Sequence, residues 1–400
     1  MWKNSLLLTS AFAALMVVAC DDQTENGNGA QTTPAESEAR KRLLRGLREN
    51  VYAPTFEQFA NSSNTLKSAC LAWQAERDEA KLETLKQAWR DAMTDWQRAE
   101  LMQIGPSGAS GRRIGGQDYR DRIYSYPISN SCRVDQELVR GSFTEPGWVN
   151  NAQFNIRGLD AMEYLIFGIS VQNTCPQTAG INRDGEWDAL KNTPDVFSDR
   201  RAAYLVALAT GVAEDAQTLM ESWTDEEGTF GSAFVNASAP FNSQKEVLDQ
   251  VFAGIFYTDK FIKDLKLGTP AGITDDCIAD VCPDMVESKW SGASKTNLLV
   301  NLDTLELIFR GGNEASQYGF DDLLIEEGAM ALTDRMNQHL NVAKEKTTLI
   351  TTSVEEQLNS NPEVVRNAHV AVRDITDDLK TQFVTVLNLS VPQEGAGDND

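Results

Sequence analysis

The stretch IRGLDAMEYLIFG, residues 156–168, has an echo later in the same chain. LDAMEYLIFG at 159–168 aligns with LDTLELIFRG at 302–311, with Leu, Asp, Glu and the final Gly in register. Apolar residues fill most of the other positions, as they do in an amphipathic helix. Each copy follows two longer helical segments, so the pattern predicts two related halves. Chance similarity between two amphipathic helices is the alternative, because that pattern is common.

Helical periodicity extends over most of the chain. Apolar residues recur every three or four positions, while alternating strand-like runs with hairpin turns are scarce. The sequence therefore predicts an all-α protein. The predicted helices cover 56–73, 82–99, 196–223, 243–267, 296–310, 326–349 and 362–389.

The N-terminus has the pattern of an export signal. Lys3 precedes an apolar run that ends in VVAC at Cys20. Small residues before a cysteine are typical of a bacterial lipoprotein signal, here residues 1–19, whose removal leaves a lipidated Cys20. An ordinary signal peptide and a membrane helix are the alternatives, although the run is short for a membrane span. We therefore expect a cell-envelope protein that is lipid-anchored and faces the periplasm; the sequence leaves inner and outer membrane open.

The rest of the chain divides by composition. Residues 20–38 are polar, with Gly and Pro and no large apolar side chain, which is typical of a flexible tether. We expect one helical bundle over 39–193, which carries the first copy of the motif. A second bundle is expected over 194–392, followed by a disordered tail at 393–400.

The charge of the chain is strongly negative. Its formal net charge is −23 and its pI is about 4.5. This balance argues against a general affinity for nucleic acid or for anionic lipid. It is compatible with the binding of cations.

The five cysteines that follow Cys20 predict two disulfides in an oxidising compartment. Cys277 and Cys282 lie in DDCIADVC between helical segments, and we expect them to pair. Cys132 and Cys175 both fall in loop-like sequence and form the second expected pair. Cys70 lies on the apolar face of a helix, which indicates a buried free thiol. None of the spacings is that of a zinc site.

Two acids of the opening stretch are candidates for a binding site. Asp160 and Glu163 are three residues apart and share one helix face beside an apolar row. They are therefore expected at the rim of a core or in a cleft, where a carboxylate must be paired, hydrogen-bonded, protonated or bound to metal. In the second copy, Glu306 precedes Arg310 by four residues, the spacing of a surface ion pair. Asp303 and Glu306 are therefore weaker candidates.

Further candidates lie upstream of the motif. Glu100 follows Trp96 by four residues and adjoins the apolar row of its helix. Arg120 and Arg122 lie among three tyrosines in GGQDYRDRIYSYP, and arginines can neutralise acids or hold an anion. For each of these residues, a structural salt bridge or a solvated face is the alternative.

Three stretches together resemble one protein family. They are AWRDAMTDWQRAELMQIGP at 88–106, YRDRIYSYP at 119–127 and RGLDAMEYLIFG at 157–168. In this order and spacing they resemble the imelysin-like proteins of the bacterial cell envelope, a group that includes proteins described as insulin-cleaving metallopeptidases and iron-regulated lipoproteins. The resemblance implies two related helical bundles with the signature near their interface. It also implies a role in iron uptake or in other periplasmic binding.

The signature differs from the family pattern at one position. That pattern is Gly-x-His-x-x-Glu, and Gly158, Glu163 and the aromatic Tyr164 match it, but its His falls on Asp160. The only histidines of the chain are His339 and His369, which lack the spacing of metal ligands. A metallopeptidase needs a bound metal with an open position and a base.

A site built from oxygen donors favours different metals from a site that contains histidine. A set made of Glu100, Asp160 and Glu163 suits a hard cation such as iron, manganese or calcium better than zinc. The sequence thus predicts a non-enzymatic binding protein linked to iron or metal uptake. Its site would lie between the two bundles, and its partner would be a metal ion, a metal-carrying ligand or an envelope protein.

Two alternatives remain open. One is a metallopeptidase in which Glu163 is a ligand or base. The other is structural, with the acids tying the halves together through Arg120 or Arg122.

Overall fold

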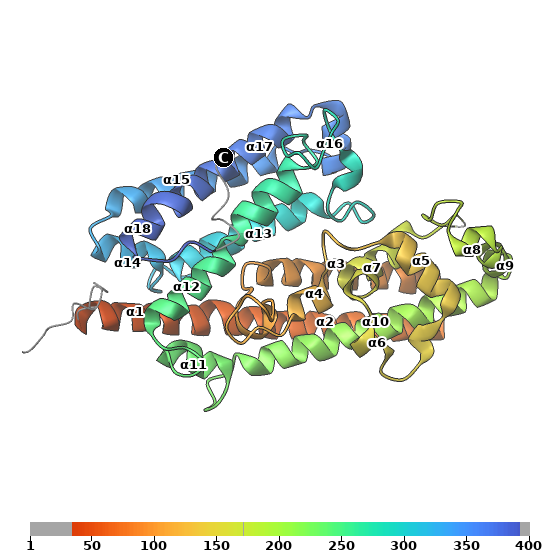
Figure 1. Ribbon diagram of the computed structural model, residues 1–400, viewed down its shortest axis with the longest axis horizontal. Helices are drawn as coiled ribbons and strands as arrows, with labels where there is room; N and C mark the ends of the chain where they lie inside the picture. The colour runs from red at the N-terminus through yellow and green to blue at the C-terminus, as the bar shows by residue number, and fades with distance from the viewer. Residues whose placement is uncertain (1–33, 171, 393–400) are drawn as a thin grey trace, which may run out of the picture.

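The computed structural model describes residues 34–170 and 172–392. Within this part of the chain all regular structure is helical and no strand is present (Figure 1), so the all-α prediction is confirmed. None of its helices is both long and apolar enough to cross a lipid bilayer. The predicted signal, the lipidation at Cys20 and the tail at 393–400 lie outside the described residues.

The first layer of helices is built around three long rods. Helix α2 packs against α3 on one side and along α10 on another (Figure 1). A π-helical turn, Arg48–Tyr52, joins α1 to α2 without a break. The elements of this layer are α1 (Pro34–Leu47), α2 (Ala53–Ala75), α3 (Glu79–Ala99), α4 (Tyr119–Ile123), α5 (Ser131–Arg140), α6 (Trp148–Asn151), α7 (Gly158–Glu163) with a π-helical continuation (Tyr164–Gly168), α8 (Gly180–Arg183), α9 (Glu186–Lys191), α10 (Pro194–Ser222) and α11 (Phe230–Asn236).

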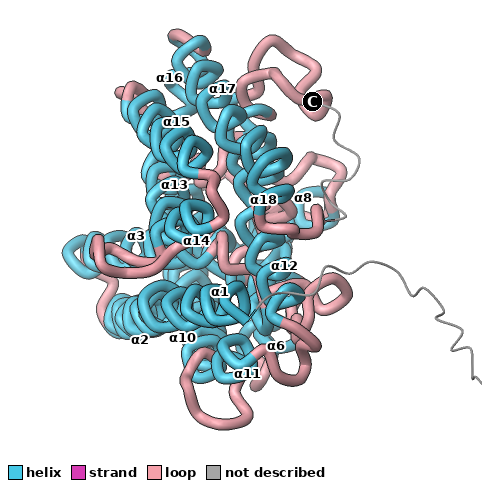
Figure 2. Tube along the Cα trace, turned by 90° about the vertical axis from the view of Figure 1, so that its left-hand side faces the viewer, coloured by secondary structure: helices cyan, strands magenta, loops and turns pink. Residues whose placement is uncertain are grey.

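The second layer contains the C-terminal helices. Here α17 packs against α15, and α13 packs against α15 as well. Figure 2 shows the two layers end-on, with α13, α15 and α17 above α2 and α10. The elements of this layer are α12 (Gln244–Ile255), a π-helical segment (Thr258–Gly268), α13 (Ser294–Arg310), α14 (Phe320–Glu326), α15 (Met330–Thr348), α16 (Val354–Ser360), α17 (Glu363–Asp378) with a π-helical continuation (Leu379–Phe383), and α18 (Val384–Val386).

The layers do not divide the chain where the sequence pattern placed the boundary. Residues 193 and 194 fall at the start of α10, yet α10 packs along α2 and α7 and lies with the first layer. The apolar face of α10 needs the buried side of α2 to cover it, which a division by internal similarity does not take into account. Whether the two layers are separate domains stays a prediction.

The predicted tether is also too long at its C-terminal end. Helix α1 already begins at Pro34 instead of after residue 38. Proline suits the first turn of a helix, and Glu36 places negative charge near the positive end of the helix dipole.

Helix α3 is where the layers meet. It packs on α2 within its own layer and on α13 of the other layer. Its apolar row is fully buried, including Leu85, Trp89 and Trp96, and the ring of Trp96 lies 5.0 Å from that of Phe59 on α2. Each such side chain stabilises the fold by about 1.5–3 kcal/mol relative to exposure. This row therefore fixes α3 in place, and α3 in turn positions the residues at its C-terminal end.

Both predicted disulfides are confirmed. Cys132 at the start of α5 is bonded to Cys175, and Cys277 is bonded to Cys282. Cys70 is a buried free cysteine, as expected from its position on the apolar face of α2.

We predict that the two disulfides contribute unequally to stability. In the chain-entropy view a crosslink stabilises more when it closes a longer loop; the partners are 43 residues apart in one case and 5 in the other. Cys132→Ser with Cys175→Ser should lower the free energy of unfolding by about 4 kcal/mol, and Cys277→Ser with Cys282→Ser by about 2 kcal/mol. Urea unfolding of both variants checks this, and the reverse order of the two losses would contradict it.

Candidate functional site

The opening motif is positioned by a close backbone contact. Gly158 starts α7 with φ +82°, and a Cβ there would lie 2.4 Å from the carbonyl oxygen of Ile123. Glycine alone tolerates both conditions, so Gly158 has a structural role. The indole of Trp89 donates to the Leu159 carbonyl at 2.8 Å, which ties α7 to α3. These contacts place Asp160 and Glu163 between the layers.

Asp160 is buried and accepts hydrogen bonds from one serine. Its Oδ2 accepts from the backbone N–H of Ser125 at 3.1 Å and from the Ser125 hydroxyl at 2.6 Å. Burial raises the pKa of Asp160 to about 6, against the opposing effect of these hydrogen bonds. The carboxylate is thus solvated by protein donors from the segment that follows α4.

Glu163 reaches across to the second layer. Its Oε1 accepts from the backbone N–H and from the hydroxyl of Ser291, each at 2.8 Å. Burial raises the pKa of Glu163 to about 7, and the nearby carboxylates of Glu287 and Asp160 raise it further, while the Ser291 donors act in the opposite direction. Neither Glu163 nor Asp160 has an ion pair within the described part of the chain. Their negative charge is therefore stabilised by dipoles without being neutralised.

Both acids line one cavity between the layers. It has a volume of about 360 Å³, and its walls come from the segment after α4, from α7 and from the 265–290 region of the second layer. The ring of Trp290 forms part of the wall and lies 5.3 Å from the ring of Tyr164. The charged residues of the lining are four acids and one base: Asp160, Glu163, Asp276, Asp284 and Lys289. We call this space the acidic cavity.

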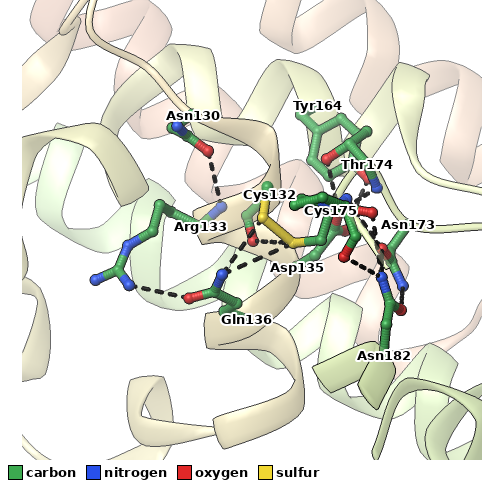
Figure 3. Close-up of a disulfide and its surroundings, with 11 residues drawn as sticks. Asn130, Cys132, Arg133, Asp135, Gln136, Tyr164, Asn173, Thr174, Cys175 and Asn182 are labelled. Atoms are coloured by element: carbon green, nitrogen blue, oxygen red, sulfur yellow. Dashed lines mark hydrogen bonds between the residues drawn. A yellow bond between two sulfur atoms is a disulfide. The ribbon is translucent and has the colours of Figure 1, made fainter. Parts of the chain in front are cut away.

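Tyr164 is held by a second buried carboxylate. Its hydroxyl donates to Asp135 at 2.7 Å, and Asp135 also accepts from the backbone and hydroxyl of Thr174, both at 2.8 Å. The disulfide from Cys132 to Cys175 lies next to these residues and fixes Thr174 against α5 (Figure 3). The sequence places Tyr164 in the motif, and this network explains how its ring is oriented.

A buried ion pair connects the layers behind the cavity. Lys266 lies 3.0 Å from Glu287 and donates to Gln97 on α3 and to Asn301 on α13, both at 2.7 Å. Glu287 also accepts from the hydroxyl of Tyr124 at 2.7 Å, and Tyr124 lines the acidic cavity. Burial lowers the pKa of Lys266 below its ordinary value.

Three of the other predicted site residues, Glu100, Arg120 and Arg122, do not line the acidic cavity. Glu100 is fully buried and pairs with Arg120 at 3.3 Å. Arg122 turns the other way and pairs with Asp215 on α10 at 2.6 Å, where Arg157 also binds. Spacing along one helix could not show this, because each arginine finds its partner on a different element.

The expected three-acid metal set is not assembled. Among residues 34–170 and 172–392, no group of three or more His, Cys, Asp and Glu side chains has a geometry that could hold a metal ion. Glu100 is bound to Arg120, while Asp160 and Glu163 accept from separate serines. The expected clasp through Arg120 or Arg122 is also absent from the described contacts, and Glu163 connects the layers through Ser291 instead.

The second copy of the motif has a different environment. Asp303 is exposed and Glu306 is partly exposed, and both pair with Lys344 on α15. Glu306 also pairs with Arg310 at 2.8 Å, the helical ion pair that the sequence spacing predicts. These acids are paired with cations and do not line the acidic cavity.

Sequence reasoning missed several residues of the site. Ser125 and Tyr124 lie inside the stretch YRDRIYSYP, so the motif gave a signal for their region but not for their roles. Ser291, Glu287 and Lys266 lie in the other half of the chain; Ser291 is 128 residues from Glu163. A single sequence holds no periodicity that connects positions so far apart.

Comparison with known proteins identifies the family. A family model described as imelysin, with the family name Peptidase M75, matches residues 52–382. The chain belongs to the imelysin family. Iron-regulated protein A of Synechococcus elongatus, a curated relative, is 20% identical over 352 residues, which cover 86% of each chain.

Solved structures show the same imelysin fold. An iron-regulated protein A precursor from Parabacteroides distasonis superimposes with a TM-score of 0.67 at 15% identity, over 90% of this chain and 96% of that one. An imelysin-like protein from Psychrobacter arcticum gives a TM-score of 0.68 at 14% identity, over 89% and 97%. At these identities the likeness concerns the fold alone.

We predict that Glu163 makes stability fall as the pH rises. Its pKa is about 7 in the folded chain and lower when unfolded, so between about pH 4.5 and 7 the folded chain keeps a proton that the unfolded chain has lost. Above that range the ionised and buried Glu163 lowers the free energy of unfolding by on the order of 3 kcal/mol. Glu163→Gln removes it, so the variant should gain stability relative to wild type between pH 5 and 8, measured by urea unfolding.

Glu306→Gln is the matched control for this experiment. It removes the corresponding glutamate of the second copy, which is partly exposed and paired with cations. Its stability difference from wild type should not grow with pH in this way. Parallel pH curves for wild type and Glu163→Gln would show that Glu163 does not titrate as described.

Proposed function

We propose that this imelysin-family chain is a non-enzymatic binding protein of the cell envelope that takes up a metal ion or a metal-carrying ligand in the acidic cavity. The observation that carries the proposal is a pair of buried carboxylates, Asp160 and Glu163, on one cavity wall without a neutralising cation among the described residues. A buried and unpaired negative charge is costly unless a cation compensates it. A bound cation would remove that cost.

The donor atoms define the class of cation. The carboxylates supply hard oxygen ligands, which favour iron, manganese or calcium over soft metals. The hydroxyls of Tyr126 and Tyr164 are already committed, since they donate to the Leu265 carbonyl and to Asp135. Two carboxylates leave most of a coordination sphere to water or to a ligand that arrives with the metal, and a cavity of about 360 Å³ has room for either.

The predicted signal and the names of the relatives support the proposed biological setting. Lipid attached at Cys20 would hold the protein at a membrane surface facing the periplasm, with the cavity open to ligands there. Relatives from Synechococcus elongatus and Parabacteroides distasonis carry the name iron-regulated protein A. Together with the hard oxygen donors, these names support a role in iron acquisition.

A peptidase activity has less support from the residues. The family name refers to a peptidase, but Asp160 stands at the position where the resemblance leads us to expect a histidine. His339 on α15 pairs with Asp378, and neither His339 nor His369 lines the acidic cavity. Cleavage of insulin by the purified protein, abolished by a chelator and by Glu163→Gln, would establish the peptidase in place of the binding protein.

We predict that cation binding depends on the first copy of the motif and not on the second. The cations to compare are iron(II) under anaerobic conditions, manganese(II), calcium(II) and zinc(II). We expect calorimetric titration to show that wild type binds one hard cation tightly. Asp160→Asn with Glu163→Gln should weaken its binding by about 100-fold, since each lost charge-assisted contact is worth about 1.5 kcal/mol or more. Binding should also strengthen from pH 5.5 to 8, because the raised pKa values of about 6 and 7 keep the acids protonated at the lower pH.

Asp303→Asn with Glu306→Gln is the matched control for the binding experiment. It makes the same chemical change at the corresponding positions of the second copy, where the acids are paired with Lys344 at the surface. Its affinity should stay within about twofold of wild type. Equal weakening in both double variants would point to a general charge effect and contradict the site. If wild type binds no metal in any titration, ferric citrate is the probe that remains for a metal-carrying ligand.

A further inference from the structure

A second cavity, on the other side of Arg120, has the opposite charge. Its volume is about 180 Å³, and it lies between the Gly-rich 105–116 loop, α4 and the turn after α12. Its charged lining consists of Arg112, Arg113, Arg120, Lys260 and one acid, Asp121. Four cationic side chains on one small cavity are unexpected in a chain whose net charge is −23. We call this space the basic cavity.

Arg120 forms the inner wall of the basic cavity. It is 7% exposed, and its NH1 and NH2 groups bind Asp121 at 3.0 Å, Glu100 at 3.3 Å and the Tyr126 carbonyl at 2.7 Å. Its Nε is buried and has no hydrogen-bond partner within the described residues. A buried guanidinium donor that lacks an acceptor is costly, and an acceptor that enters the cavity would satisfy it.

The rest of the cavity is held in shape by the loop and by α12. The backbone of Ile114 donates to Gln250 at 3.0 Å, and Arg113 donates to the Ala253 carbonyl at 3.4 Å. Gly108 lies against the side chain of Arg113, where a Cβ would come within 2.6 Å of it. The loop is therefore folded onto α12, with Arg113 between the two. On the opposite wall, the ring of Phe261 lies under the guanidinium of Arg120 at 5.0 Å.

We propose that the basic cavity binds a small oxyanion, either inorganic phosphate or the carboxylates of a small organic acid. Arginine presents paired N–H groups in the geometry that phosphate and carboxylate oxygens accept. The anion accepts from the Nε–H of Arg120, because the other donors of this guanidinium are already bound. Arg113 and Lys260 add positive charge to the same lining, although Lys260 also lies 3.9 Å from Asp259 and 3.8 Å from Asp264. The single acid, Asp121, is engaged with Arg120. The cavity volume admits an ion of this size and excludes a nucleotide.

The two cavities are separate sites connected by one hydrogen bond. Arg120 on the basic cavity donates to the carbonyl of Tyr126, and Tyr126 lines the acidic cavity. An anion does not enter the acidic cavity alone, because the charge there has the same sign. The anion site therefore does not depend on the proposed cation site, and the two can fail independently.

The test is calorimetric titration of the mature protein with sodium phosphate, sodium sulfate and sodium malonate, with sodium chloride at matched ionic strength as the reference. Phosphate or malonate should bind with 1:1 stoichiometry and raise the melting temperature above the chloride reference. A response to phosphate and sulfate identifies the inorganic ion, and a stronger response to malonate identifies the organic acid. No binding of any of the three beyond chloride overturns the proposal.

Variants of two other lining residues locate the site without disturbing the buried pair of Arg120 and Glu100. Arg113→Gln with Lys260→Gln should weaken anion binding at least tenfold. Lys86→Gln with Arg98→Gln removes the same two charges from ion pairs on α3 and should leave the affinity within about twofold. Equal loss in both double variants overturns the assignment.

A third variant separates this site from the acidic cavity. Asp160→Asn with Glu163→Gln should bind the anion as wild type does while losing the hard cation. Loss of anion binding in that variant would place the anion on a metal in the acidic cavity and overturn the separate site.

Discussion

Lys266 is a lysine buried where the two helical layers meet. Its ammonium group contacts Glu287 together with Gln97 of α3 and Asn301 of α13, so one charge is shared by elements from both layers. Removing one partner of such a pair leaves a buried charge without compensation, at a cost of about 3–5 kcal/mol. The pair therefore ties the two layers together at this point. The wall of the acidic cavity depends on it, because Glu287 also holds the hydroxyl of Tyr124.

The same sequence pattern serves two different purposes in this fold. In the first copy, Asp160 and Glu163 lie on a short helix that starts against Ile123 and is enclosed by both layers. In the second copy, the matching acids lie on a long helix, where Lys344 pairs with both of them. Burial raises the pKa of the first pair, while the second pair is an ordinary surface network. The raised pKa values of the first pair therefore come from their environment and not from the motif.

The sequence predicted the helices because their apolar periodicity is local, and most helix bounds lie within a few residues of the predicted ones. Both disulfides were also predictable from loop context. What the sequence missed depends on contacts between distant segments. The packing of α10 on α2, the partner of Arg122 on α10 and the Ser291 donors to Glu163 each join residues far apart along the chain. The basic cavity could not be predicted from the net charge of the chain either, because a net charge does not show where the basic and acidic side chains lie in space.

The placement of α10 has a consequence for the order in which the protein folds. When the chain is synthesised from its N-terminus, α2 cannot be covered until α10 is complete at residue 222. The acidic cavity is completed later still, because Ser291 and Glu287 follow. In a partly folded chain Asp160 and Glu163 are hydrated carboxylates of ordinary acidity. Their raised pKa values are thus a property of the fully folded protein. They distinguish it from a partly folded chain that already contains most of the helices.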